Sequence, residues 1–196
     1  MMRKTTSALI GLALTASVMS SALAATTIDT GAPSGNGFSL ALDSTDWLAG
    51  QISFNQASTI QSIKTYLDDN GNGAGSFTIA LYLDSASHLP GDLLNSWSAS
   101  GASGWNGVSN MNQAVAAGSY WVALEIQGSD TFSGLAPTGV ATPLAKYAFN
   151  AGGYQGYQSM PDAFGLQVVA VPEPESYAML LAGLGLIGFA ARRRAH

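Results

Sequence analysis

The sequence predicts an all-β protein: an antiparallel β-sandwich of jelly-roll type, flanked by an N-terminal signal helix and a C-terminal transmembrane helix. Three observations favour this class. Short apolar runs, many of them alternating with polar residues, fill the middle of the chain, as in strands with one covered face. Clusters of Gly, Asn, Ser and Pro separate these runs, as turns do. No long helical pattern occurs outside the two ends, so strands must supply the core.

Eight apolar runs are predicted as strands because they are short and rich in β-branched and aromatic residues. In chain order they are residues 37–43, 47–55, 59–67, 76–83, 93–100, 119–127, 145–150 and 164–170. The segments between them, such as DDNGNGAG, SASHLPGD, GASGWNG and NAGGYQG, have the composition of turns and loops. The runs SFTIALYL and SYWVALEI carry the most continuous apolar sequence, so we expect them to form central strands.

Residues 1–24 are predicted to be a secretory signal peptide. Two basic residues near the start precede an apolar centre over residues 8–18, and the small residues Ala22 and Ala24 follow. This order is typical of a substrate of signal peptidase. We expect cleavage after Ala24, which leaves Ala25 as the new N-terminus of the body, residues 25–170. An uncleaved N-terminal anchor is the alternative.

Residues 171–196 form the third predicted region. Residues 177–191 are uncharged, and fifteen residues of helix span about 22 Å. That is short of a hydrocarbon core of about 30 Å, but Ser176 and snorkelling arginines bring a helix of about 176–191 closer to spanning. Arg192, Arg193 and Arg194 are the expected membrane stop on the cytoplasmic side.

The segment before this helix contains more than an anchor needs. Pro172 and Pro174 remove two backbone donors and hold the chain extended around Glu173. Together with the apolar run and the terminal arginines, residues 171–194 resemble the PEP-CTERM sorting signal of Gram-negative bacteria. The resemblance implies that an exosortase recognises the Pro-Glu-Pro motif and removes the tail. An ordinary single-pass anchor is the alternative.

The predicted route follows from these two ends. The protein is exported, held transiently in the inner membrane with its body outside, and then placed at the cell surface or in the extracellular matrix. The body between Ala25 and Val171 holds two cations against ten acids, a formal charge of −8. Such a surface repels phosphate backbones, so nucleic acid is excluded as a partner. The absence of cysteine excludes disulfides, thiolate metal sites and cysteine nucleophiles.

A weak calcium site is predicted in DDNGNG. Asp68, Asn70 and Asn72 place oxygen donors at alternate positions before a glycine, as in the opening of a calcium loop. The acid expected at position twelve is replaced by Ile79. A hairpin turn accounts for the same residues without a metal ion. The sequence implies no cofactor besides this calcium ion.

Possible glycan contacts are Trp105, Tyr154 and Tyr157, which lie in Gly-rich segments predicted as loops. Sugar rings stack on exposed aromatic side chains, whereas Trp121 lies in an apolar run and is expected in the core. These three aromatics could also cap the ends of a sandwich.

Catalysis is not expected. His88 is the only histidine between residues 25 and 170, and a neighbouring Ser85 or Ser87 does not establish a triad. A pair of carboxylates for glycoside hydrolysis could still meet in the fold; the candidates are Asp84, Asp92, Glu125 and Asp130. The sequence therefore predicts a non-enzymatic structural or adhesive protein of the cell surface or exopolysaccharide matrix. A carbohydrate-binding module, with or without stabilising calcium, is the alternative, and a glycan-active enzyme is the third reading.

Overall fold

The computed structural model describes residues 25–35, 37–152, 156–173 and 183–187. Several residues singled out in the sequence lie outside these ranges: Ala22, Ala24, Tyr154, Pro174 and Arg192–Arg194. The predicted signal helix lies outside them as well. Of the predicted C-terminal helix, only residues 183–187 are described, and these are helical. In the parts of the chain that the structure covers, no helix has the length and hydrophobicity needed to span a membrane.

The described chain forms strands almost throughout. Their bounds are β1 Thr26–Asp29, β2 Ser39–Leu42, β3 Asp46–Phe54, β4 Ser58–Leu67, β5 Gly75–Asp84, β6 Pro90–Gly101, β7 Gly104–Val115, β8 Gly118–Glu125, β9 Gly134–Pro137, β10 Tyr147–Ala151, β11 Gln158–Met160 and β12 Leu166–Pro172. All eight predicted runs contain a strand, and the fold is all-β as predicted.

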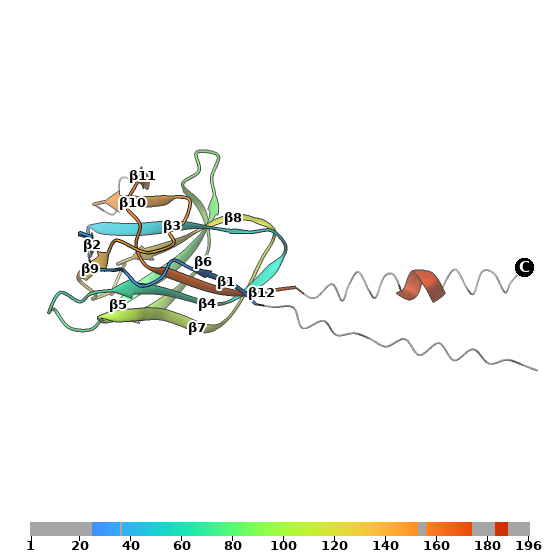
Figure 1. The fold of residues 1–196 in the computed structure, drawn as a ribbon, viewed down its shortest axis with the longest axis horizontal. Helices are drawn as coiled ribbons and strands as arrows, with labels where there is room; N and C mark the ends of the chain where they lie inside the picture. The colour runs from blue at the N-terminus through green and yellow to red at the C-terminus, as the bar shows by residue number, and fades with distance from the viewer. Residues whose placement is uncertain (1–24, 36, 153–155, 174–182, 188–196) are drawn as a thin grey trace, which may run out of the picture.

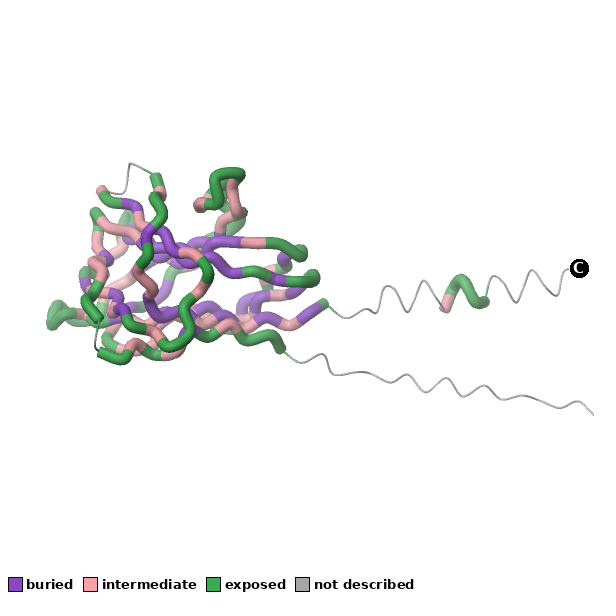
Figure 2. The backbone as a smooth tube through the Cα atoms, turned by 45° about the horizontal axis from the view of Figure 1, so that its top comes forward, coloured by how far each residue is buried: buried purple, intermediate pink, exposed green. Residues whose placement is uncertain are grey.

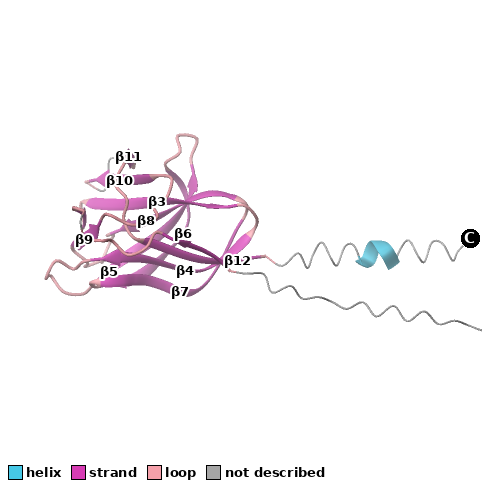
Figure 3. Ribbon diagram, viewed as in Figure 1, coloured by secondary structure: helices cyan, strands magenta, loops and turns pink. Residues whose placement is uncertain are grey.

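These strands build a sandwich of antiparallel sheets (Figures 1 and 3). One sheet has the order β1-β12-β4-β7, and the other has the order β11-β10-β3-β8-β5-β6. A short β2-β9 pair completes the fold. The predicted interior position of β5 and β8 is confirmed. In the larger sheet β8 lies between β3 and β5, and β5 lies between β8 and β6.

The hydrophobic core fills the space between the two large sheets (Figure 2). In β8 the side chains of Tyr120, Val122 and Leu124 belong to this core. Trp121 and Ala123, on the opposite face, join a second buried cluster with Ala80. Successive side chains along a strand point to opposite faces of the sheet. Since both sets of side chains in β8 are buried, the larger sheet is covered on both of its faces.

The sequence missed four strands, β1, β7, β9 and β11. The largest of these is β7, which begins inside the segment predicted as a loop. Gly107 lies opposite Lys64 in β4, and a Cβ there would approach the carbonyl oxygen of Ile63 to 2.1 Å. Glycine in this segment therefore permits close approach of two strands, whereas its composition suggested a turn. At the other end of the body, β12 continues to Pro172, beyond the predicted boundary at residue 170.

Candidate functional site

The DDNGNG segment forms the turn between β4 and β5, and the turn itself uses several of its polar atoms. The Asp68 carboxylate accepts hydrogen bonds from the Asn70 N–H at 2.9 Å and the Ser103 hydroxyl at 3.3 Å. The Asn72 side chain donates to the carbonyl of Ser133 at 2.9 Å. Asn70 and Gly71 have left-handed backbones, with φ of 51° and 77°, as Asn-Gly turns require. Turn geometry accounts for these residues, and calcium binding stays a prediction.

Within the described residues, no three His, Cys, Asp or Glu side chains form a cluster that could hold a metal ion.

Two of the three aromatic residues named for glycan contact, Trp105 and Tyr157, contact other residues of the body. Trp105 lies in β7 and packs edge-on against Tyr66 of β4, with ring centroids 5.5 Å apart and an interplanar angle of 89°. Tyr157 donates its hydroxyl hydrogen bond to Glu125 at 2.6 Å. Tyr154 lies outside the described residues. Glycan contact by this set stays a prediction. Trp121 is fully buried, as the sequence predicted for it.

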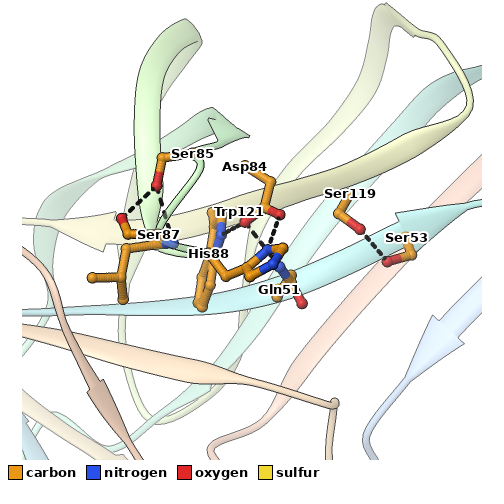
Figure 4. Close-up of polar contacts among 9 residues, drawn as sticks. Gln51, Ser53, Asp84, Ser85, Ser87, His88, Ser119 and Trp121 are labelled. Atoms are coloured by element: carbon orange, nitrogen blue, oxygen red, sulfur yellow. Dashed lines mark hydrogen bonds and ion pairs between the residues drawn. The ribbon is translucent and has the colours of Figure 1, made fainter.

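Asp84, at the end of β5, organises a polar cluster on the outer face of the larger sheet (Figure 4). Its Oδ1 accepts hydrogen bonds from Trp121 Nε1 at 2.8 Å and from Gln51 Nε2 at 3.0 Å. Its Oδ2 lies 2.8 Å from His88 Nδ1. Burial alone would raise the pKa of the Asp84 carboxyl, but the hydrogen bonds from His88, Trp121 and Gln51 outweigh burial and hold this pKa below its usual range.

The Asp84–His88 pair has two of the three members of a hydrolase triad. His88 is 63% exposed and has a left-handed backbone with φ of 56°. Ser85 and Ser87, the hydroxyls nearest in sequence, lie 2.9 Å from each other. Among the described hydrogen bonds, His88 Nε2 meets no hydroxyl. The cluster can therefore orient an imidazole and hold the loop that carries it.

Glu125 is a second acid on the same face and, unlike Asp84, it is buried. It has no exposed surface, and its Oε1 accepts hydrogen bonds from the hydroxyls of Tyr82 at 2.8 Å and Tyr157 at 2.6 Å. Its Oε2 accepts from the side chain of Gln127. Burial and the negative charge of Glu125 raise the pKa of both tyrosines. The carboxylate therefore ties the segment that carries Tyr157 to β5 and β8.

The remaining acids considered for catalysis are Asp130, which shares a partner with Glu125, and Asp92. Asp130 accepts hydrogen bonds from the Thr78 hydroxyl at 2.8 Å and the Gln127 N–H at 3.1 Å. Gln127 therefore links Asp130 to Glu125, whose carboxylate already serves three donors. Asp92 lies in the exposed part of β6. The sequence did not reveal any of these groupings, because they depend on strand register.

A cavity of about 420 Å³ opens between β2 and the β11 edge of the larger sheet. Its apolar lining comprises Leu40, Ala41, Leu48, Phe149, Met160 and Pro161. Its polar lining comprises Ser39, Asp46, Ser159 and Asp162. Phe149 is partly exposed and packs against the main core. The cavity thus combines an aromatic side chain with two carboxylates, and the sequence analysis did not foresee it.

The junction between body and tail is the last functional feature. Pro172 is buried and is the final residue of β12, where it pairs with Ser58 of β4. The next residue, Glu173, is exposed, and its N–H donates to the Ala57 carbonyl at 2.9 Å. Residues 170–194 match the family of the PEP-CTERM protein-sorting motif.

The chain carries a PEP-CTERM sorting motif. The motif implies an exported protein that is sorted at a membrane and processed by an exosortase. It begins at Ala170, inside β12, so this sorting motif overlaps the folded body by three residues of strand, Ala170–Pro172.

Other comparisons add little to the sorting motif. No curated protein matches the chain. Among solved structures, a chain in the structure of infectious bursal disease virus Gx strain shares 11% sequence identity with this protein, with a TM-score of 0.24. The match covers 79% of this chain and 42% of the viral chain. At that score the likeness carries no argument about fold or function.

Proposed function

We propose that the body is a non-catalytic structural or adhesive β-sandwich of the cell surface or exopolysaccharide matrix. The observation that carries this proposal is the sorting motif that continues directly from the last strand of an all-β body. The motif accounts for export, and the sandwich is the part that is delivered. Two further contacts favour a structural role. The partly buried Asp84 and the buried Glu125 each accept several hydrogen bonds from the body, as carboxylates withdrawn from solvent in stable folds do.

The proposed route uses both ends of the chain. Signal peptidase cuts after Ala24, and a helix of about 176–191 holds the body at the outer face of the inner membrane. Arg192–Arg194 stay on the cytoplasmic side. An exosortase then removes the tail, and the body reaches the surface or matrix.

Alanine replacement of Pro172, Glu173 and Pro174 tests this route. The full-length variant should accumulate in the membrane fraction with its tail intact, whereas the wild-type protein is processed and released. Processing and release of the triple variant at the wild-type rate would show that the tail is only an anchor. Deletion of the whole gene should in addition weaken the cohesion of the matrix or floc.

A carbohydrate-binding module is the second candidate, and the cavity between β2 and the β11 edge favours it. Sugar rings present C–H faces that pack on aromatic side chains and hydroxyls that donate to carboxylates. Phe149 supplies the first kind of group, and Asp46 and Asp162 supply the second. Ligand sites are usually pockets of about this volume, lined mainly by apolar side chains with a few polar groups. Glycan contact by Trp105, Tyr154 and Tyr157 and a calcium ion at Asp68 belong to the same proposal.

Retention of the purified body on the organism's own exopolysaccharide tests this candidate. Retention should fall in Asp162→Ala and stay at the wild-type value in Asp92→Ala, because Asp92 is exposed on β6, outside the cavity lining. Loss of retention in chelator would assign DDNGNG to a calcium site. Sugar fragments released during the assay would favour the glycan-active enzyme. No retention in either buffer would leave a structural protein whose partners are other proteins.

A further inference from the structure

The sorting motif begins inside the fold. β12 is an inner strand, paired with β1 on one side and with β4 on the other. Val169 and Ala170 pair with Thr27 and Thr26 of β1, and the ladder with β4 continues to Pro172. The strand therefore cannot leave the sheet before Pro172 without breaking antiparallel ladders.

Two contacts hold Pro172 and Glu173, the first two residues of Pro-Glu-Pro, at the turn that joins β3 to β4. Pro172 is buried and lies opposite Ser58. The Glu173 N–H donates to the Ala57 carbonyl at 2.9 Å, which adds one more hydrogen bond after the strand. Proline suits the end of a strand because it has no N–H to donate. In Figure 1 the end of β12 and the start of β1 lie at the same end of the sandwich as this turn.

The two residues differ in what they offer to an enzyme. The Pro172 ring is covered by the body, whereas the Glu173 side chain is exposed. A protease needs its substrate backbone free of competing ladders, so cleavage inside a folded strand requires local opening of that strand. The described contacts between the motif and the body end at Glu173, so they impose this requirement only up to that residue.

We infer that the folded body sets the upstream limit of exosortase cleavage. The enzyme breaks a peptide bond on the C-terminal side of Glu173, at the Glu173–Pro174 bond or beyond it, and the β3–β4 turn, residues 55–57, fixes this limit. With water as the nucleophile, the C–N bond breaks, the retained carbonyl becomes a carboxylate, and the tail leaves with a new amino group. The inference uses the processing that the motif implies and does not depend on a matrix or glycan-binding role.

The first test is the intact mass of the processed protein, purified from the organism that makes it. We expect a C-terminus at Glu173 or at a later residue. A C-terminus at Pro172 or earlier would overturn the inference, because the cut would then lie within β12.

The second test separates the motif from the turn. A short Gly-Ser linker inserted between Val171 and Pro172 of the full-length chain carries the motif away from Ala57 and Ser58. A pulse-chase experiment with intact-mass analysis of the product should then find ends upstream of Glu173, in the linker or at Pro172, that the wild type lacks, because the turn no longer limits the enzyme there. The matched control has the same linker between Glu175 and Ser176, which lengthens the tether but leaves Glu173 on the turn.

The control should keep the wild-type cut, at Glu173 or at a later residue. Identical C-terminal ends in the two linker variants would overturn the inference, because the contact with the turn would then not limit where the enzyme cuts. The Pro-Glu-Pro alanine variant, followed in the same experiment, reports separately on the sorting route. Its processing at the wild-type rate would count against exosortase recognition, whereas the position of the cut in any released product still decides where the body sets the limit.

Discussion

The outer faces of the two large sheets differ in how they are covered. In β4 and β12 of the smaller sheet, buried residues alternate with partly exposed ones along most of the strand. In β8 of the larger sheet, six consecutive residues from Tyr120 to Glu125 are buried. Alternation indicates one covered face, and continuous burial indicates two. The larger sheet therefore has a second small core around Trp121, and the carboxylates of Asp84 and Glu125 accept hydrogen bonds at this face.

The comparison implies that the second core contributes more to stability than the outer face of the smaller sheet. Trp121→Ala should lower the free energy of unfolding by about 3–5 kcal/mol, the range for a fully buried aromatic. Trp105→Ala, on the smaller sheet, should cost about 1 kcal/mol because its side chain is partly exposed. Urea denaturation of the body measures both. Equal losses would show that the outer faces of the two sheets contribute alike.

Glu125→Gln tests whether the buried carboxylate is needed. The variant keeps the shape but weakens the acceptor for Tyr82 and Tyr157, so we expect a loss of about 2 kcal/mol. Asp92→Asn, on exposed β6, is the matched control and should stay within about 0.5 kcal/mol of wild type. A Glu125→Gln variant as stable as its control would mean that the carboxylate contributes no net stability.

The same cluster predicts a loss of stability at alkaline pH. Burial and the charge of Glu125 raise the pKa of Tyr82 and Tyr157 in the folded state above the unfolded value, which is about 10. Their contribution is therefore complete below about pH 10 and is lost as pH rises through the raised values. Thermal melts between neutral pH and pH 11 should show this decline. The double variant Tyr82→Phe/Tyr157→Phe should be less stable than wild type at neutral pH, but its stability should decline less as pH rises. An equal decline would assign the loss of stability to other groups. One of these is Tyr147, whose pKa is also raised by burial.

Asp84 should give a smaller effect at the acid end. Its folded pKa is lowered, so its contribution is present above the unfolded pKa of about 4 and is lost as pH falls through the folded value. In Asp84→Asn the free energy of unfolding should decline less than in wild type as pH falls. The NMR signals of His88 should also broaden, because the imidazole loses its charged partner. A decline equal to that of wild type would show that the hydrogen bonds from Trp121 and Gln51 do not depend on the charge.

The smallest effect is expected on the smaller sheet. Asn110 is exposed in β7 and has a left-handed φ of 58°, which glycine adopts without a Cβ clash. Asn110→Gly should change stability by about 0.5 kcal/mol or less, whereas Asn110→Val should cost about 1–2 kcal/mol. Chemical denaturation compares the two. A Val variant as stable as the Gly variant would show that the backbone relaxes at this position.

Prediction from sequence succeeded where burial leaves a local pattern. The runs around Ile79 and Val122 are apolar enough to identify β5 and β8 as central strands. It failed for β7, because glycines such as Gly107 are needed there for close approach to β4 and were interpreted as turn residues. The cavity beside Phe149 was also missed, since its lining comes from four strands and the segment that follows β11.

The class of the fold and the sorting motif can be derived from the amino-acid sequence alone, because both depend on residues close together in the chain. Alternating apolar residues specify strands, and Pro172-Glu173-Pro174 is recognisable as a short peptide. The contacts of Asp84 with Gln51 and Trp121, and of Glu173 with Ala57, follow from the three-dimensional fold and not from any local pattern. These contacts join residues distant in sequence, and strand order and register, which the whole core fixes, place them together.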